Sequence, residues 1–187
     1  DWTLPGNYVQ KNDLMILDLL AHNNWNRPVY FAATAPANSY LNLAPYLQLE
    51  GFAYRLVPIK HDADSNTETL VNEDVMYKNM KNFVWGGMEK PGMNLDNVFL
   101  RSCAVNTRQR FSELASAFLE KGKKEKAIEV LDKAMEVTPE ENVPYDATIY
   151  SIVIGYYQAG AFDKANALAE KLFNNCESNL TYYYSLD

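Results

Sequence analysis

Residues that bind metals or form disulfides are scarce in this sequence. Its 187 residues include two cysteines, Cys103 and Cys176, and two histidines, His22 and His61. None of the four has a partner at the short spacing of a zinc site or of a Cys-His nucleophile pair, so we predict neither site and no cofactor. Both cysteines fall in predicted helices, where a free thiol behaves as a small apolar group; a disulfide between them stays open.

Long apolar runs and clusters of basic residues are also missing. The longest apolar run, 14–21, is interrupted by Asp18 and is far too short to cross a bilayer, so we expect no direct membrane insertion. No basic-then-apolar leader opens the chain. The formal net charge is −7 and is spread along the sequence, which disfavours a nucleic-acid partner. Because the chain begins at Asp1 rather than at methionine, we expect a domain excised from a longer protein.

Sequence signatures of catalysis are absent as well. Gly86 and Gly87 lack both the lysine and the spacing of a phosphate-binding loop. A pair of glycosidase carboxylates needs only to meet in space, so the abundant acidic residues neither indicate nor exclude one. We therefore predict no catalytic residue and expect that this fragment is not an enzyme.

A helical repeat of about 34 residues is the strongest pattern that is present. Between Arg108 and Pro139, apolar and small residues recur where two antiparallel helices would pack closely, with Gly122 at the turn. Pro139 ends the second helix because it has no N–H to donate. The inner-face residues are Phe111, Leu114, Ala115 and Phe118, followed by Ala127, Leu131 and Ala134. The stretch is typical of a tetratricopeptide repeat.

A second, degenerate copy of this repeat follows. Its turn residue, Gly160, stands 38 residues after Gly122, and Ala165 and Leu172 follow at the offsets of the first copy. We place the two repeats at about 108–139 and 146–177.

Two further expectations concern the ends of the second repeat. The connection over 140–144 is longer than a standard one, so we expect it to bulge from the stack. A further helix is expected to start at 179 and to run to 187, with Tyr182, Tyr183 and Tyr184 covering the second repeat.

The first hundred residues follow a different pattern. The expected elements, in order, are helix 9–22, strand 28–33, helix 41–49, strand 52–59 and helix 71–82. A Gly-rich segment comes next, and Asp96 is expected to cap a long helix that runs into the first repeat. We therefore predict an α+β, mostly helical fold, with a small α/β unit at 1–95 and a helical region at 96–187.

The concave face of the repeats is the predicted binding surface. Repeat geometry would place three residues of each first helix there, and these are Gln109, Ser112 and Ser116, then Tyr150, Tyr157 and Gln158. Polar and aromatic side chains of this kind suit an extended polypeptide. They lack the basic cluster that would bind a terminal carboxylate.

Two other groups of residues have features of binding sites. Asp62, Asp64, Asn66 and Glu73 stand at positions 1, 3, 5 and 12 of a calcium-binding loop. However, a threonine replaces the glycine that the loop needs, which favours a solvated acidic loop, so we predict no metal site. Large residues beside turns could bind a sugar, but a role in holding strands and loops together is favoured. These residues are Trp25, Arg27, Arg55 and Trp85.

Three phrases together carry a family resemblance. NNWNRPVYFAAT (23–34), YLQLEGFAYRLVPI (46–59) and FVWGG (83–87), followed by the repeats, resemble the C-terminal region of a family of large multi-spanning membrane proteins of Bacteroidetes-type bacteria. That family, formerly of unknown function, is similar to protein O-mannosyltransferases of the membrane-embedded GT-C class.

The resemblance implies where this region lies in the cell and which half of the parent protein carries catalysis. The catalytic acid and the lipid-linked sugar site would lie in the transmembrane half of the parent, so no catalytic residue carries over to this chain. The region would be extracytoplasmic, and periplasmic in a bacterium. We expect a non-catalytic binding or scaffolding domain whose partners are a polypeptide and the transmembrane half. The alternatives are a purely structural cap of the membrane domain and an independent carbohydrate-binding or hydrolase domain.

Overall fold

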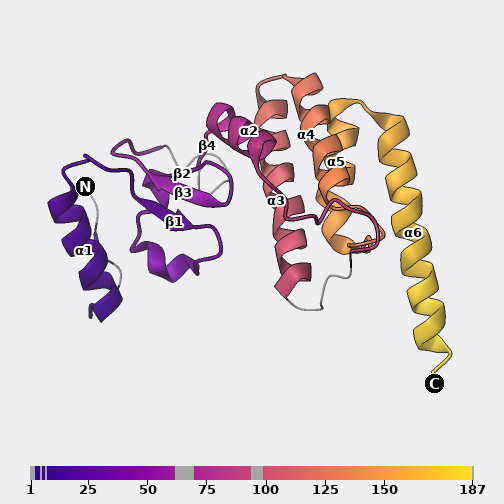
Figure 1. Ribbon diagram of the computed structural model, residues 1–187, viewed down its shortest axis with the longest axis horizontal. Helices are drawn as coiled ribbons and strands as arrows, with labels where there is room; N and C mark the ends of the chain where they lie inside the picture. Colours follow the sequence, from indigo (N-terminus) through magenta and orange to yellow (C-terminus); the bar gives the residue numbers. More distant parts are fainter. Residues whose placement is uncertain (1–2, 5, 7, 62–69, 94–98, 187) are drawn as a thin grey trace. The chain divides into compact units, whose positions relative to one another are not determined.

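The computed structural model describes residues 3–186, except 5, 7, 62–69 and 94–98 (Figure 1). Helices dominate, and a small four-stranded sheet lies near the N-terminus, which confirms the predicted α+β, mostly helical class. None of the helices in the described ranges is long and apolar enough to cross a membrane. The calcium-loop residues Asp62, Asp64 and Asn66 lie outside the described residues; Glu73 is buried at the start of a helix.

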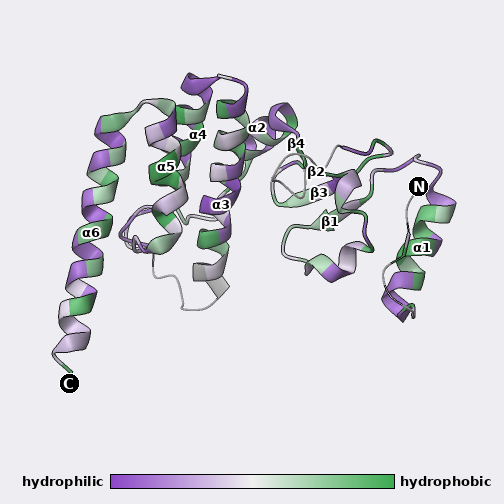
Figure 2. Cartoon of the chain, turned by 180° about the vertical axis from the view of Figure 1, so that it is seen from behind, coloured by the Kyte–Doolittle hydropathy of each residue, from purple (hydrophilic) through white to green (hydrophobic). Residues whose placement is uncertain are grey.

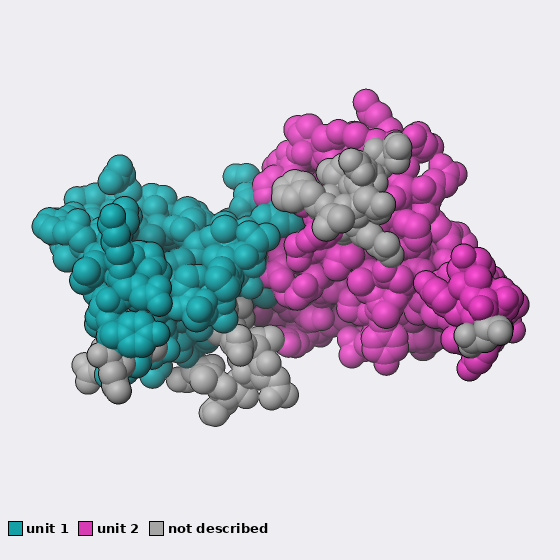
Figure 3. Space-filling model, turned by 90° about the horizontal axis from the view of Figure 1, so that it is seen from below, with its two compact units in different colours: residues 1–80 teal, residues 81–187 magenta. Residues whose placement is uncertain are grey.

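The chain divides into two compact units, residues 1–80 (unit 1) and 81–187 (unit 2), which Figure 3 colours separately. The sequence placed a boundary at 95/96 instead. Residues between the two positions make contacts inside unit 2: the Trp85 ring packs on Phe111 with centroids 5.5 Å apart, and the carbonyls of Met88 and Lys90 accept hydrogen bonds from Asn142. These contacts place the segment after Met80 with the helices.

Unit 1 is built around the small sheet. Its elements are α1 (Lys11–Asn23), β1 (Tyr30–Ala32), two 3-10 turns (Ala37–Tyr40 and Ala44–Tyr46), β2 (Leu47–Leu49), β3 (Ala53–Leu56), β4 (Leu70–Val71) and most of α2 (Glu73–Asn82). The strand order is β1-β3-β2-β4. β3 pairs antiparallel with β1 and β2, and β4 joins β2 in parallel.

One face of this sheet forms the core of unit 1. Because side chains alternate along a strand, Phe31 and Tyr54 point to the same side as Leu47 and Leu56. Buried side chains of the 3-10 segment, such as Tyr40, complete the cluster. Ile16 and Leu20 of α1 pack against it as well.

The prediction of a helix at 41–49 is wrong. Leu41 and Asn42 adopt left-handed φ angles of 50° and 61°, and Pro45 has no N–H to donate, so a regular helix cannot form there. The chain makes 3-10 turns instead and then enters β2.

Unit 2 contains α3 (Phe99–Glu120), α4 (Lys124–Val137), α5 (Tyr150–Ala159) and α6 (Phe162–Tyr184), which lie side by side in chain order (Figure 1). All seven inner-face residues of the first predicted repeat are buried. Gly122 and Gly160 have φ angles of 69° and 86° at the two turns, where a side chain would be strained. Both expected helical hairpins are present. Their membership of the tetratricopeptide class stays a prediction.

Two expectations about unit 2 are wrong. No new helix starts at 179, because α6 runs unbroken to Tyr184, and Tyr182, Tyr183 and Tyr184 are exposed rather than packed on the second hairpin. Hydrophobic patches recur along α6 beyond its first half (Figure 2), and Phe173 and Leu180 are exposed there. The connection between α4 and α5 does not bulge into solvent, since Val143 and Tyr145 are buried in it.

Candidate functional site

The predicted binding residues lie on α3 and α5. Gln109, Ser116 and Gln158 are exposed, and Tyr150 is the most open aromatic of the group at 62% exposure. We call these four residues, together with Tyr157, the α3/α5 face.

Ser112 lies in the contact between the two helices rather than on this open face. It is 8% exposed, and its Oγ lies 3.0 Å from Oγ of Ser151 on α5. Sequence reasoning missed Ser151, because a contact between the first helices of two repeats leaves no periodic signal within either repeat. The hydrogen bond joins α3 to α5 and keeps their exposed residues in a fixed relation.

Tyr157 is partly fixed by the next helix. Its hydroxyl donates to Oδ1 of Asn166 on α6 over 2.5 Å, and its ring centroid lies 6.3 Å from that of Phe162. The side chain remains 37% exposed. Tyr157 is therefore more confined than Tyr150, which is 62% exposed.

A charged pair lies beside Gln109 on α3. Gln109 Nε2 donates to Glu113 Oε1 over 3.1 Å, and Nη1 of the buried Arg110 lies 2.8 Å from Glu113 Oε2. Burial raises the pKa of Glu113, and Arg110 and Gln109 oppose that shift. The guanidinium of Arg110 is thus paired with Glu113 within α3.

Arg108 has a structural role that the repeat pattern did not predict. It is fully buried, and its guanidinium makes five hydrogen bonds to the connection that follows α4, the shortest over 2.6 Å from Nη2 to the carbonyl of Val143. Its Cζ also lies 5.3 Å from the centre of the Tyr145 ring. Burial lowers the pKa of Arg108 below its ordinary value. The repeat pattern marked this position as the first of the repeat but not its partners.

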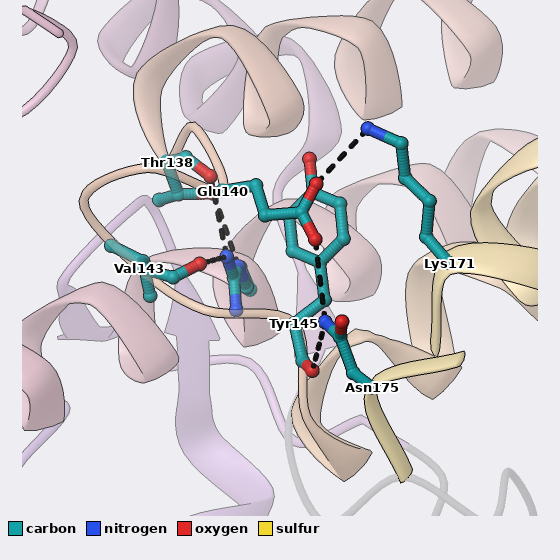
Figure 4. Close-up of polar contacts among 7 residues, drawn as sticks. Thr138, Glu140, Val143, Tyr145, Lys171 and Asn175 are labelled. Atoms are coloured by element: carbon teal, nitrogen blue, oxygen red, sulfur yellow. Dashed lines mark hydrogen bonds and ion pairs between the residues drawn. The ribbon is translucent and has the colours of Figure 1, made fainter. Parts of the chain in front are cut away.

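The same connection is tied to α6 on its other side (Figure 4). Glu140 accepts from Lys171 Nζ at 3.0 Å and from Asn175 Nδ2 at 3.3 Å, and Asn175 also donates to the carbonyl of Tyr145 at 3.2 Å. The hydrogen bond to Glu140 raises the pKa of Lys171. Held from α3 and from α6, the connection fixes the start of α5 and with it the position of Tyr150.

In the part of the chain that the structure describes, no group of three or more His, Cys, Asp or Glu residues could hold a metal ion. Cys103 is half-buried in α3 and Cys176 is exposed in α6, and neither of the two forms a disulfide. Cys176 is therefore not packed into the core as a small apolar group.

The large residues beside turns have separate roles. The Trp85 ring packs against Phe111 and lies 5.8 Å from that of Phe83, as expected of a residue that holds a loop in place. Trp25 and Arg27 are exposed in unit 1. Arg55 pairs with Glu50.

A surface hollow of about 410 Å³ in unit 1 lies away from all of the predicted residues. Tyr8, Gln10, Asp13 and Asn38 are among the residues that line it. The Asp13 carboxylate already accepts hydrogen bonds from the backbone of Gln10 and the side chain of Asn12, as part of the N-terminal cap of α1. The hollow is thus shaped by a helix cap.

Comparison with protein-family models gives a match in unit 1. No curated protein matches the chain, and no solved structure matches it. No catalytic family is found for it. Residues 1–75 match the family model described as TMEM260-associated domain 2, so unit 1, apart from its last residues, is similar to that domain.

Proposed function

We propose that this chain is a non-catalytic binding or scaffolding domain of an extracytoplasmic, periplasmic region, attached to a membrane protein that resembles a GT-C glycosyltransferase. The match of residues 1–75 to a TMEM260-associated domain supports the attachment, in agreement with the resemblance of the sequence phrases. The partner on the α3/α5 face is an extended polypeptide. Under this proposal the transmembrane half of the parent protein is the second partner.

One observation carries the polypeptide partner: Tyr150 and Tyr157 are exposed on α5, and Gln109 and Gln158 are exposed on α3 and α5. Both helices are held by contacts with their neighbours. An extended backbone presents an N–H and a C=O at each residue, and Gln109 and Gln158 can donate and accept. Tyrosine rings add apolar contact area at a low cost in side-chain entropy.

The exposed C-terminal tyrosines bear on the main alternative. A purely structural cap would be favoured if Tyr182, Tyr183 and Tyr184 filled the face of the repeats. All three are exposed on α6. The α3/α5 face is therefore not covered by the chain's own tyrosines, which favours binding.

A peptide titration of the 187-residue chain tests the proposal. Unstructured peptides containing serine and threonine are added, and backbone amide shifts are followed by NMR. We expect saturable shifts on α3 and α5, and we expect Tyr150→Ala to weaken binding by about tenfold or more, since aromatic anchors dominate small interfaces.

Tyr183→Ala is the matched control. Tyr183 is 66% exposed, close to the 62% of Tyr150, but it lies on α6. Binding should be unchanged in this variant. Equal loss in both variants, or no saturable shift on α3 and α5 with any peptide, would contradict the proposal.

A further inference from the structure

The surface hollow of unit 1 lies where three segments of the chain meet. The N-terminal segment contributes Tyr8, the first turn of α1 contributes Asn12 and Asp13, and the segment after β1 contributes Asn38 and Leu41. Its volume of about 410 Å³ falls within the range of about 300–1,000 Å³ that is usual for small-molecule sites. The α3/α5 face belongs to the other unit, so the hollow is a separate candidate site.

Contacts within unit 1 hold the walls of the hollow in place. Leu41 is 2% exposed and belongs to the core of the unit, and Ile16 and Leu20 of α1 pack against the same core. The Asn42 side chain donates to the carbonyl of Thr3 over 3.1 Å, which ties the N-terminal segment to the chain after Leu41. The hollow therefore exists without a ligand.

The polar side chains of the lining can be reached from solvent. Tyr8 is 74% exposed, and Asn12 and Asn38 are exposed as well. Asn12 Nδ2 donates to Asp13 Oδ1 over 2.9 Å, which leaves the second N–H and the carbonyl oxygen of this amide for a ligand. Asp13 Oδ2 accepts from the backbone of Gln10 over 2.9 Å, and a carboxylate oxygen can accept a further hydrogen bond.

The charge of the lining favours a neutral ligand. Of the described residues that line the hollow, Asp13 alone is charged, so an anion would meet a carboxylate and no basic side chain. The carboxylate is a poor site for a cation too, because two N–H donors and the positive end of α1 already stabilise it. The ligand that fits is therefore uncharged and rich in hydrogen-bonding groups.

The hydroxyls of a sugar ring match these side chains. An amide can donate to one hydroxyl and accept from its neighbour, and Asn12 and Asn38 offer such pairs from two segments. The Ser39 hydroxyl donates to the carbonyl of Pro36, so its lone pairs remain as acceptors. Tyr8 supplies an exposed aromatic ring for the C–H face of a sugar. The N–H and C=O of a backbone amide point in opposite directions and cannot serve neighbouring partners in this way.

We propose that the hollow of unit 1 is a saccharide-binding site. Asn12 and Asn38 hydrogen-bond to neighbouring hydroxyls of a pyranose, Asp13 accepts from a further hydroxyl, and the Tyr8 ring contacts the C–H face. No bond is made or broken at this site. It recognises a neutral sugar.

NMR titration of the whole chain tests this site. The probes are the methyl pyranosides of glucose, galactose and mannose, with ethylammonium, inorganic phosphate and N-methylacetamide for the competing chemistries. We expect at least one pyranoside to shift the side-chain amide signals of Asn12 and Asn38 saturably, with a dissociation constant of about 1–50 mM. The three competing probes should cause no saturable shift at these signals.

Variants of exposed side chains separate recognition from folding. Asn38→Ala and Tyr8→Ala should each weaken pyranoside binding by about tenfold. Tyr184→Ala is the matched control for the tyrosine, because Tyr184 is 78% exposed but lies on α6. Asn174→Ala, at an exposed position of the same helix, is the control for the amide. Both controls should bind the pyranoside as the natural chain does.

Three results would overturn the site. These are the absence of a saturable shift with every pyranoside, pyranoside binding that survives both Asn38→Ala and Tyr8→Ala, and saturable binding of a competing probe at the same signals. A circular dichroism spectrum identical to that of the natural chain shows that each variant is folded. Peptide binding at the α3/α5 face is read from amides of α3 and α5, so failure of one proposal does not imply failure of the other.

Discussion

A single buried arginine holds the connection between the two hairpins of unit 2. Arg108 reaches from α3 to the carbonyls of Thr138, Val143 and Pro144, and it carries a charge into a site shielded from water. An arginine is suited to this because its planar fork donates in several fixed directions at once.

We predict that Arg108→Met destabilises the chain by about 3 kcal/mol, because methionine fills part of the space but leaves the carbonyls without a donor. Arg108→Lys should be intermediate, since lysine keeps the charge but not the fork. Urea unfolding gives the free energies. Lys124→Met, at the exposed start of α4, is the control. A loss below about 1 kcal/mol for Arg108→Met would show that the connection does not depend on this residue.

The raised pKa of Glu113 makes the free energy of unfolding depend on pH. Burial raises its pKa above the ordinary value of 4.5, so the folded state holds this proton more tightly than the unfolded state does. The resulting stabilisation is fully present below about pH 4.5 and is lost as the pH rises through the raised pKa. Relative to Glu113→Gln, the natural chain should therefore lose unfolding free energy between about pH 4 and pH 7.

Urea unfolding of both proteins at the two pH values measures this difference. Glu125→Gln, at an exposed position of α4, controls for the change of a carboxylate to an amide. A difference that does not change with pH would mean that the Arg110 contact cancels the effect of burial.

At the scale of elements, α4 and α5 approach each other at a glycine. A Cβ added to Gly155 would lie 3.0 Å from Cδ1 and 3.3 Å from Cδ2 of Leu131. Two effects of Gly155→Ala therefore oppose each other: alanine favours the helix by about 0.5–1 kcal/mol, while overpacking costs about 1–3 kcal/mol.

The contact with Leu131 decides which effect is larger. We predict that Gly155→Ala destabilises the natural chain by about 1 kcal/mol but stabilises a Leu131→Ala background by about 0.5–1 kcal/mol. A double-mutant cycle of urea unfolding measures the coupling. The same sign in both backgrounds would show that Leu131 moves aside easily.

Predictability from the sequence differed between these elements. The helices of unit 2 follow a strong apolar periodicity, with Phe111, Leu114 and Phe118 on one face. The local sequence therefore predicts where each helix and turn lies. The partners of Arg108 and the contact of Ser112 with Ser151 join positions 30 to 40 residues apart, and no local pattern carries them.

Segment 41–49 shows why the sheet of unit 1 was harder to predict. Its leucines and tyrosines fit a helical face, yet left-handed turns and Pro45 decide the backbone. β2 and β4 are short, and their pairing depends on chain segments that are distant in sequence. The exposed residues Tyr30 and Arg55 lie opposite each other on β1 and β3, and only the strand register shows this.

At the scale of the molecule, the sequence pattern and the observed contacts assign residues 81–95 to different units. The motif pattern assigns them to the α/β unit, because repeat-like helices begin later. Contacts assign them to unit 2, because Lys81 Nζ lies 2.8 Å from Glu129 Oε1 and the Trp85 ring packs on Phe111. Asn142, buried in the connection, donates to two carbonyls of the same segment.

The stabilities of two fragments show which of the two boundaries is correct. We predict that fragment 81–187 unfolds cooperatively on its own and that fragment 96–187 is less stable by about 3 kcal/mol, because the loss of a packed tryptophan alone costs about that much. For a chain of about 100 residues this corresponds to a melting midpoint lower by roughly 10–20 °C. Thermal unfolding followed by circular dichroism measures both. If the fragments melted together, the boundary at 95/96 would be the better one and residues 81–95 would contribute nothing to unit 2. Trp85→Ala in fragment 81–187 provides the finer test: it should account for most of the difference, because the Trp85 ring is the largest side chain that this segment packs against α3.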